Sequence, residues 1–322
     1  MNVKSILPRE VRANDSYTFL MSELEKTDQA ILEPLSGTDW PRDMPVITGN
    51  GLIESIASID VVYGSSGGED DCIIFSETND IPVIQADMSK SVARTFNFAE
   101  MLSFSILDEE KMKSVGRDPM TFLDKGIRLH LDKTIDRSVY KGFNKAKSTG
   151  LVNNPDIIRT MAQAHTSGGS DTQWSAKTAD EILRDINQII SDVWMDNDCS
   201  PDALPNQILV PVDAFGQLVS RKVADDSGRS ILQYIRENNL TSQQGGELVI
   251  SPCKWLTGAG TSGRNRMVCY MNHVNRICFN LTQPLRRMTT EWQDLKIKIP
   301  YIAQFSEVRF LYPSTVRYMD GI

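Results

Sequence analysis

The stretch from Asp118 to Phe143 constrains the fold more than any other part of this sequence. Asp118 followed by Pro119 predicts a helix start, because the aspartate can cap the first turn and proline at the first helical position loses no hydrogen bond. Apolar residues then recur at every third or fourth position, at Met120, Leu123, Ile127, Leu131, Ile135, Val139 and Phe143. The pattern predicts one amphipathic helix over 119–143, about 36 Å long, and a single helix of this length indicates a spine.

The sequence before this helix predicts a long β-hairpin. Two apolar stretches typical of strands, Gly51–Tyr63 and Cys72–Phe75, flank the polar turn Gly64–Asp71, and a further strand is predicted at Val83–Ala86. The turn is rich in glycine and acidic residues, so it has nothing to bury within its own chain. A protruding docking arm and an ordinary surface hairpin are both consistent with these residues.

Residues 1–45 contain several prolines and no long regular element, which indicates an arm.

The second half of the chain alternates between helices and strands. The polar stretch Thr166–Thr172 is the most linker-like of the sequence and marks a candidate subdomain boundary. Thr178 and Glu181 form a capping box at the start of an amphipathic helix that continues through Val193. Shorter elements are predicted at 207–210, 213–223, 230–238, 248–250, 267–271, 274–281, 295–301, 308–312 and 315–319. They lack the regular spacing of a nucleotide-binding fold, and with 322 residues they predict an α+β fold of about two domains.

Charge and cysteine content argue against several classes of function. The formal net charge of −8 disfavours a protein that grips nucleic acid, because phosphate binding needs clustered Lys and Arg. No apolar run approaches the roughly 20 residues of a membrane span, and no secretion signal is visible, so we expect a cytosolic protein at synthesis. The five cysteines contain no CxxC pair, which makes buried free thiols the default expectation. A zinc site made by Cys253, Cys269, Cys278 and His273 would lack the spacing that such sites use.

The sequence shows no constellation for catalysis or cofactor binding. The histidines His130, His165 and His273 have no neighbouring serine, cysteine or carboxylate motif, and His130 is interpreted as a structural or subunit-facing residue. Gly258–Gly263 matches GxGxxG, but it does not lie between a buried strand and a helix. We therefore predict no catalytic residue, no metal and no cofactor. A cytosolic α/β enzyme is the least favoured alternative.

The order of these elements resembles the Hong Kong 97-type capsid fold of the major capsid proteins of tailed bacteriophages. That order is an arm, a protruding hairpin, a long capped helix, a turn, an α/β part and a returning β segment. Single phrases add to the likeness, namely Ile81-Pro-Val-Ile84, Gly150-Leu-Val-Asn-Asn-Pro155, Arg309-Phe-Leu-Tyr-Pro-Ser-Thr-Val316 and Asp320-Gly-Ile322. The resemblance covers nearly the whole chain.

The resemblance implies a division of the chain and a function. It assigns an N-arm to 1–45, an E-loop hairpin to 46–95, a peripheral domain to 96–175 with its spine helix at 119–143, an axial domain to 176–285 and return strands of the peripheral domain to 286–322. Copies would associate as pentamers and hexamers into an icosahedral head shell around phage double-stranded DNA, in the host cytoplasm during assembly and then in the virion. An encapsulin-like nanocompartment, which has the same fold but encloses protein, is the alternative.

The resemblance also implies partners and contact residues. A separate scaffolding protein, a portal and a cement protein are the implied partners, with DNA near the shell by proximity only and no membrane. The candidate subunit contacts are Gly67, Gly68, Glu69, Asp70, Arg286 and Arg287. Arginine is enriched at such contacts, and Arg264 and Arg266 lie upstream of the arginine pair. Some relatives join subunits through a lysine near the hairpin, but the turn Gly64–Asp71 has none and Lys90 is expected near the hairpin base, so we expect a shell without covalent links.

Overall fold

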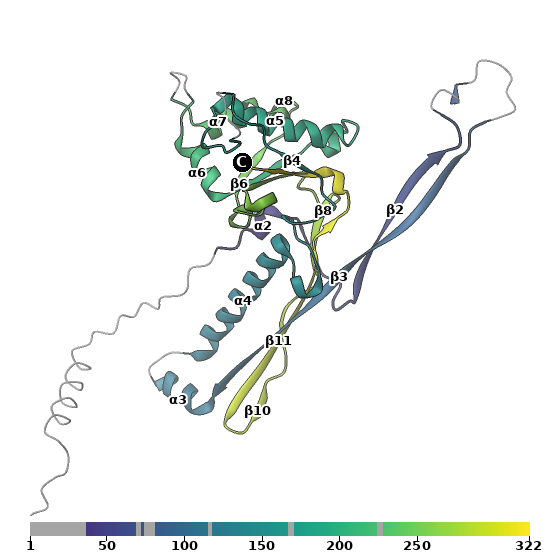
Figure 1. The fold of residues 1–322 in the computed structure, drawn as a ribbon. Helices are drawn as coiled ribbons and strands as arrows, with labels where there is room; N and C mark the ends of the chain where they lie inside the picture. Colours follow the sequence, from purple (N-terminus) through teal and green to yellow (C-terminus); the bar gives the residue numbers. More distant parts are fainter. Residues whose placement is uncertain (1–36, 69–71, 74–80, 115–117, 167–170, 224–227) are drawn as a thin grey trace, which may run out of the picture. The chain divides into compact units, whose positions relative to one another are not determined.

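The long helix α4 spans Pro119–Lys141 in the computed structural model (Figure 1). The Asp118 carboxylate caps it as predicted, accepting a hydrogen bond from the Met120 N–H at 3.1 Å. The helix ends two residues before the predicted Phe143, because Gly142 adopts a φ of 67°. A Cβ atom there would collide with the backbone that follows the turn, so glycine is required at this position.

The structure describes residues 37–68, 72–73, 81–114, 118–166, 171–223 and 228–322. The chain divides into two units, Met1–Gly37 and Thr38–Ile322, and every helix and strand named here lies in the second. Most of the predicted arm therefore lies outside the described residues. None of the helices in the described ranges is long and apolar enough to cross a membrane.

One five-stranded sheet supports α4. Its longest strand, β3 (Ile84–Ser105), pairs antiparallel with β2 (Ser55–Ser65) along its first half and with β11 (Lys296–Ser306) along its second half. β9 (Gln283–Arg287) and β10 (Glu291–Gln293) pair with β11 as well. Figure 1 shows β2 and β3 extending away from the helices as a two-stranded ribbon. A hairpin is thus present before α4, with its first strand close to the predicted Gly51–Tyr63 but with β3 as the second strand.

The helix α4 covers one face of this sheet. A buried apolar cluster forms there from Leu102, Ile127, Ile297, Ile299 and Tyr301. The alternation predicted for 295–301 produces it, because every second residue of β11 points to the helix. Each of these buried side chains contributes about 1.5–3 kcal/mol of hydrophobic stabilisation. The short helix α3 (Ile106–Ser114) follows β3.

A second five-stranded sheet forms a larger core. Its order is β4 (Arg159–Met161), β13 (Val316–Asp320), β7 (Arg266–Tyr270), β5 (Gln207–Val210) and β6 (Val249–Pro252). The helices that pack on it are α5 (Ala179–Met195), α6 (Val212–Ser220), α7 (Ile231–Asn238) and α8 (Leu240–Gln243). The predicted capping box of Thr178 and Glu181 is present at the start of α5. β13, although part of the range 286–322, lies in this sheet and not in the sheet under α4.

A three-stranded sheet completes the fold. β8 (Ile277–Leu281) pairs with β1 (Val46–Thr48) and with β12 (Arg309–Phe310). Its apolar residues belong to a cluster that also includes side chains of α4, β5, β7 and β11. Short 3-10 turns occupy Asn144–Ala146, Pro201–Ala203, Lys254–Leu256, Thr261–Gly263 and Pro313–Thr315. The mixture of helices and sheets confirms the α+β class.

The one-turn helix α2 (Trp40–Asp43) ties the beginning of this unit into the core. Trp40 packs against Phe279, with 5.7 Å between the ring centroids. The buried Asp43 carboxylate accepts hydrogen bonds from the Tyr140 hydroxyl and from Gln207 Nε2, the latter at 3.1 Å. Residues from Trp40 onward, within the range 1–45 assigned to an arm, therefore belong to the folded core.

The predicted second hairpin strand at Cys72–Phe75 is wrong for Cys72 and Ile73, which belong to no strand, and 74–80 lie outside the described residues. The partner of β2 is instead the first half of β3, of which the prediction at Val83–Ala86 caught only the beginning. β3 then continues to Ser105. Its polar residues hid its length, because a ribbon exposed on both faces needs no continuous apolar run.

Candidate subunit-contact surfaces

The β2/β3 ribbon has one apolar side. Residues opposite each other in the ladder share a face, and the register pairs Ala57 with Val92, Val61 with Met88 and Tyr63 with Ala86. The same side carries one charged residue, Lys90, opposite Ile59. The other side is mostly polar, with Ser58, Asp60, Asp87, Ser89 and Ser91 beside the apolar Ile56, Val62 and Ala93. The alternation from Ile84 to Val92, interrupted only by Lys90, was a readable signal for this surface that the sequence prediction missed.

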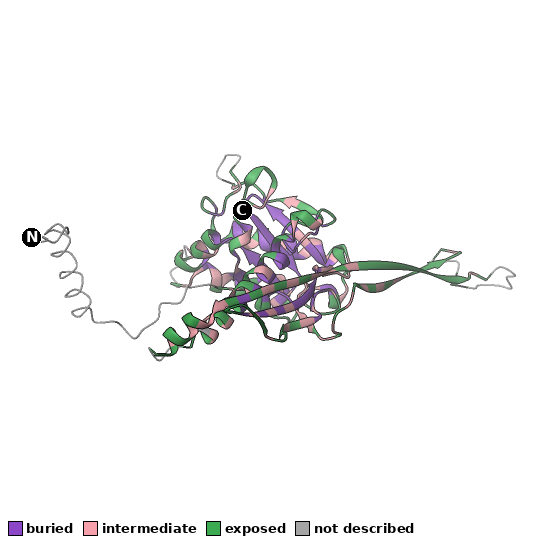
Figure 2. Cartoon of the chain, turned by 90° about the horizontal axis from the view of Figure 1, so that it is seen from below, coloured by how far each residue is buried: buried purple, intermediate pink, exposed green. Residues whose placement is uncertain are grey.

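The apolar side of the ribbon is uncovered. Ile59 is 70% exposed and Met88 is 74% exposed, and no other element of the described chain packs on them. Figure 2 shows most of the ribbon in the colour of exposed residues, in contrast to the buried centre of the fold. Exposed apolar stretches of this size mark interaction sites, because burying them removes apolar surface from water.

The predicted contact residues at the hairpin tip are only partly described. Beyond β2, the Ser66 N–H donates to the Val83 carbonyl at 3.0 Å and the Gly67 N–H donates to the Ser65 hydroxyl at 3.3 Å. Gly68 is exposed. Glu69 and Asp70 lie outside the described residues.

The sequence prediction placed Lys90 near the hairpin base, and this is wrong. It stands opposite Ile59, in the middle of a ladder that runs from Ser55 to Ser65. The prediction placed Lys90 too close to the base because it did not recognise the first half of β3 as the partner of β2.

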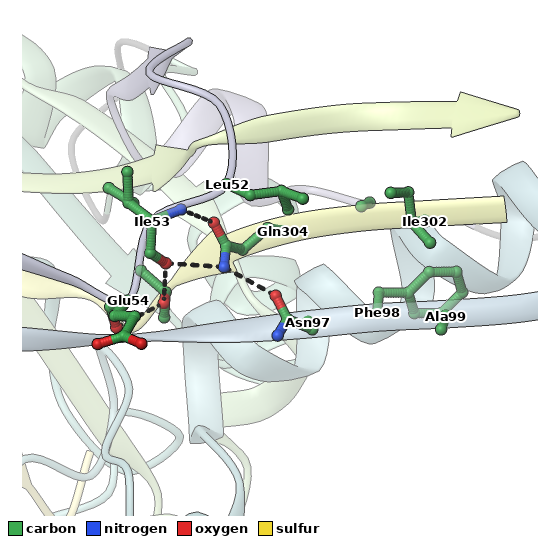
Figure 3. Close-up of a pocket in the computed structure, with 10 residues that line it drawn as sticks. Leu52, Ile53, Glu54, Asn97, Phe98, Ala99, Ile302 and Gln304 are labelled. Atoms are coloured by element: carbon green, nitrogen blue, oxygen red, sulfur yellow. Dashed lines mark hydrogen bonds between the residues drawn. The ribbon is translucent and has the colours of Figure 1, made fainter. Parts of the chain in front are cut away.

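A pocket of about 600 Å³ lies where the ribbon meets the sheet (Figure 3). Gln304 organises it: its side-chain oxygen accepts from the Ile53 N–H at 2.9 Å, and its amide nitrogen donates to the Ile53 carbonyl at 2.8 Å and to Asn97 Oδ1 at 2.7 Å. Apolar side chains of Leu52, Ala99 and Ile302 line the rest. The pocket therefore has an ordered polar floor and an apolar wall.

Arg286 and Arg287 do not form one patch. Arg286 pairs with Ile302 and so lies on the pocket side of the sheet, whereas Arg287 pairs with Tyr301 on the side of α4. There the hydrogen bond from Arg128 holds the pKa of Asp124 below its ordinary value, with Arg287 contributing through its charge. Neighbouring residues of a strand always point to opposite faces, so the strand at 283–287 separates the pair.

The two upstream arginines lie elsewhere in the fold. Arg266 is buried and makes a bidentate pair with Asp320, at 2.6 Å and 2.9 Å. Arg264 is exposed and lines a different pocket, with Gly321 and Ile322. The GxGxxG stretch before them is a turn whose Thr261 N–H donates to Asp320, so it is not a dinucleotide loop.

Within the described ranges there is no group of side chains that could hold a metal ion. Cys253, Cys269 and Cys278 are buried free thiols, and burial raises the pKa of Cys253 to about 12. Cys72 and Cys199 are exposed, so the expectation of buried thiols is wrong for these two.

His130 is exposed on α4, and its Nδ1 lies 2.9 Å from a Glu100 carboxylate oxygen, a partner that the sequence did not reveal. No serine or cysteine hydrogen-bonds to this ring in the described structure. The pair therefore offers no nucleophile to activate.

Comparisons with known proteins agree with this geometry. The profile of a family described as major capsid protein matches residues 70–322. The capsid of Myoviridae phage XM1 is similar over 100% of both chains, at 14% identity and a TM-score of 0.75. The capsid of a native GTA particle is similar over 92% of this chain and 94% of that chain, at 11% identity and a TM-score of 0.62. A virus-like particle from Pyrococcus furiosus is similar over 87% of this chain and 91% of that chain, at 11% identity and a TM-score of 0.52. No curated protein matches the sequence.

Proposed function

Because this chain belongs to the major capsid protein family, we propose that its β2/β3 ribbon is the arm that joins neighbouring copies into the shell. The protein is a structural, shell-forming component of the virion capsid. The observation that carries the proposal is the uncovered apolar side of the ribbon, with Ile59, Val61, Tyr63, Met88 and Val92 exposed. A lone two-stranded ribbon is marginal in water, so covering this side by a neighbour stabilises both the ribbon and the shell.

The ribbon tip and Arg286 are the proposed polar contacts. Arg286 lies on the pocket side of the sheet, and its positive charge complements the acidic tip, which carries Glu69 and Asp70. Gly67 and Gly68 let the backbone of the tip approach closely. Arg287, the remaining sequence candidate, is proposed to act within its own subunit because it faces α4.

Charge reversal tests these contacts. Arg286→Glu is expected to reduce the yield of shells, and the pair Glu69→Lys with Asp70→Lys is expected to restore it in the same chain. Arg287→Glu is the matched control and is expected to leave shell yield unchanged. Equal loss of shells in both arginine variants, without rescue, would contradict the assigned contact.

We further propose an icosahedral head built of pentamers and hexamers around double-stranded phage DNA. A scaffolding protein, a portal and a cement protein would be separate chains. Electron microscopy and nucleic-acid analysis of purified particles test this. Closed shells with DNA support it. A strictly monomeric chain at high concentration contradicts shell formation, and shells filled with protein cargo favour the nanocompartment alternative, which the likeness to a virus-like particle keeps in view.

A further inference from the structure

The two strands that flank β3 lie on opposite edges of it. Toward β11, the Ile106 N–H donates to the Leu295 carbonyl and the Glu307 N–H donates to the Arg94 carbonyl, both at 3.0 Å. Even-numbered residues of β3 therefore direct their backbone groups toward β11. At the ribbon end, the Val83 carbonyl accepts from Ser66, which follows β2, so odd-numbered residues direct their groups toward β2.

Half of each edge of β3 is consequently open. The first residue of β2, Ser55, lies opposite Arg94, so the pairing of β2 with β3 stops there. β3 runs on to Ser105. Beyond that point the backbone groups of Asn97, Ala99, Met101 and Ser103 point away from β11. In the described part of the chain, no strand pairs with them and no backbone hydrogen bond is made there.

This open edge has the features of a strand-docking site. Unpaired N–H and C=O groups along a strand are a template for another strand, and proteins usually block such edges with lysine, proline or bulges. The four residues that face the edge carry no charge and include no proline, and Met101 is 51% exposed. The pocket of Leu52, Ala99 and Ile302 lies at one end of this edge.

We propose that the open edge at Asn97–Ser103 receives the β2 strand of a second copy of this chain, paired antiparallel to β3 and in line with the subunit's own β2. The inference rests on the proposed function and specifies the surface on which the ribbon docks. The outer edge of β2 is also unpaired in the described structure, and the residues that face it, Ala57, Ile59, Val61 and Tyr63, are uncharged. The open edge of β3 in the ribbon carries Lys90, which blocks it as an alternative donor.

Lengths and faces agree with this pairing. The edge from Asn97 to Ser105 is about 30 Å long and β2 is about 36 Å long, at about 3.3 Å per residue. Hydrogen-bonded partners share a face, so Ile59 and Val61 of one copy come to lie beside Ala99 and Met101 of the next. The apolar side of the ribbon thereby continues the apolar pocket side of the neighbour's sheet.

The pairing is head-to-tail. Each copy donates β2 and accepts at β3 through different surfaces, which makes the contact heterologous, and heterologous contacts close into rings. The direction of β2 carries the tip of one ribbon toward the base of the next ribbon. The pocket lies there, at the end of the open edge nearest the ribbon.

Amide hydrogen exchange on the full chain tests the pairing without any substitution. In unassembled subunits the amides of Ala99, Met101 and Ser103 are expected to exchange fast, and in rings or shells at least about tenfold more slowly. The amides of Leu102 and Phe104 already bond to β11 and serve as internal controls, protected in both states. Shells in which the three odd-numbered amides stay fast overturn the inference and leave the proposed function intact, whereas failure to form any ring or shell overturns both.

Proline variants identify the donor. Met101→Pro removes an outward N–H of the acceptor edge and Ile59→Pro removes one of the donor edge, and neither group bonds within the subunit. Each variant alone is expected to remain monomeric, and a mixture of the two is expected to form dimers but no rings. Met101→Ala keeps the N–H and is expected to form rings. Rings formed by Ile59→Pro would show that another segment occupies the edge and would overturn the assignment to β2.

Discussion

The ribbon and the region around α5 both contain apolar residues, but they differ in how far these residues are buried within the chain. Ile186 and Ile189 of α5 are fully buried against their own sheet, whereas Ile59 of the ribbon is 70% exposed. The first region is stable through contacts within the chain, and the second is proposed to find its apolar partner in another copy. The comparison teaches that apolar residues in a strand do not always mark the core of the single chain, because those of the ribbon are left exposed.

The largest effect is expected from a substitution of Asp320, which is buried in the region that is stabilised by contacts within the chain. Burial opposes its ionisation, but hydrogen bonds from Arg266 and Thr261 outweigh that effect and hold its pKa below the ordinary value. Asp320→Ala would leave the buried Arg266 guanidinium without its counter-charge, which costs about 3–5 kcal/mol. Urea unfolding of unassembled subunits measures this. A loss below about 1 kcal/mol would contradict the account.

Truncating a core side chain of α5 is the next largest change. Ile186→Ala leaves a cavity in a fully buried site and is expected to lower the free energy of unfolding of the subunit by about 2–5 kcal/mol. The same urea titration measures it. An unchanged midpoint would show that α5 is not packed as described.

The ribbon counterpart of that change is Ile59→Ala. Here the unfolding free energy of the subunit is expected to stay within about 0.5 kcal/mol, because the side chain is exposed. Shell yield, measured by sedimentation, is expected to fall. A variant that loses subunit stability but assembles normally would reverse the comparison.

The smallest expected effect is a pH dependence at the start of α5. Hydrogen bonds from the Thr166 hydroxyl and from the Thr178 and Thr166 N–H groups lower the pKa of Glu181 to about 2 from 4.5. A carboxyl with a lowered folded-state pKa stabilises above the unfolded-state value, so this contribution is lost as the pH falls from 4.5 toward 2. Glu181→Gln is expected to flatten that part of the stability curve. Identical curves for the two proteins would assign the acid sensitivity to other groups.

Local signals made much of the fold predictable. Asp118 with Pro119, and Thr178 with Glu181, set two helix starts that the structure reproduces, because capping depends on neighbours in sequence. Strand 207–210 was predicted with its bounds. The C-terminal end of the long helix was harder to predict than its start. It depends on the backbone conformation of Gly142, which periodicity alone did not locate.

The contact surfaces were harder to predict because they depend on long-range pairing. The second half of β3 pairs with β11, some two hundred positions further along the chain. Its other edge is open because β2 begins only at Ser55, opposite Arg94. Arg286 and Arg287 look like one site in sequence but diverge once their strand is recognised. The sequence prediction did not include Asn97, Ala99 and Met101, the residues of the proposed docking edge, because the missing strand partner is visible only once the pairing of β3 is known.

Electron cryo-microscopy of the assembled shell tests the central claim most directly. The account predicts that the apolar side of the ribbon, including Ile59 and Met88, lies against a neighbouring copy, with β2 of one subunit beside β3 of the next. A shell in which the ribbon stands free in solvent, or is covered only by its own subunit, would contradict it.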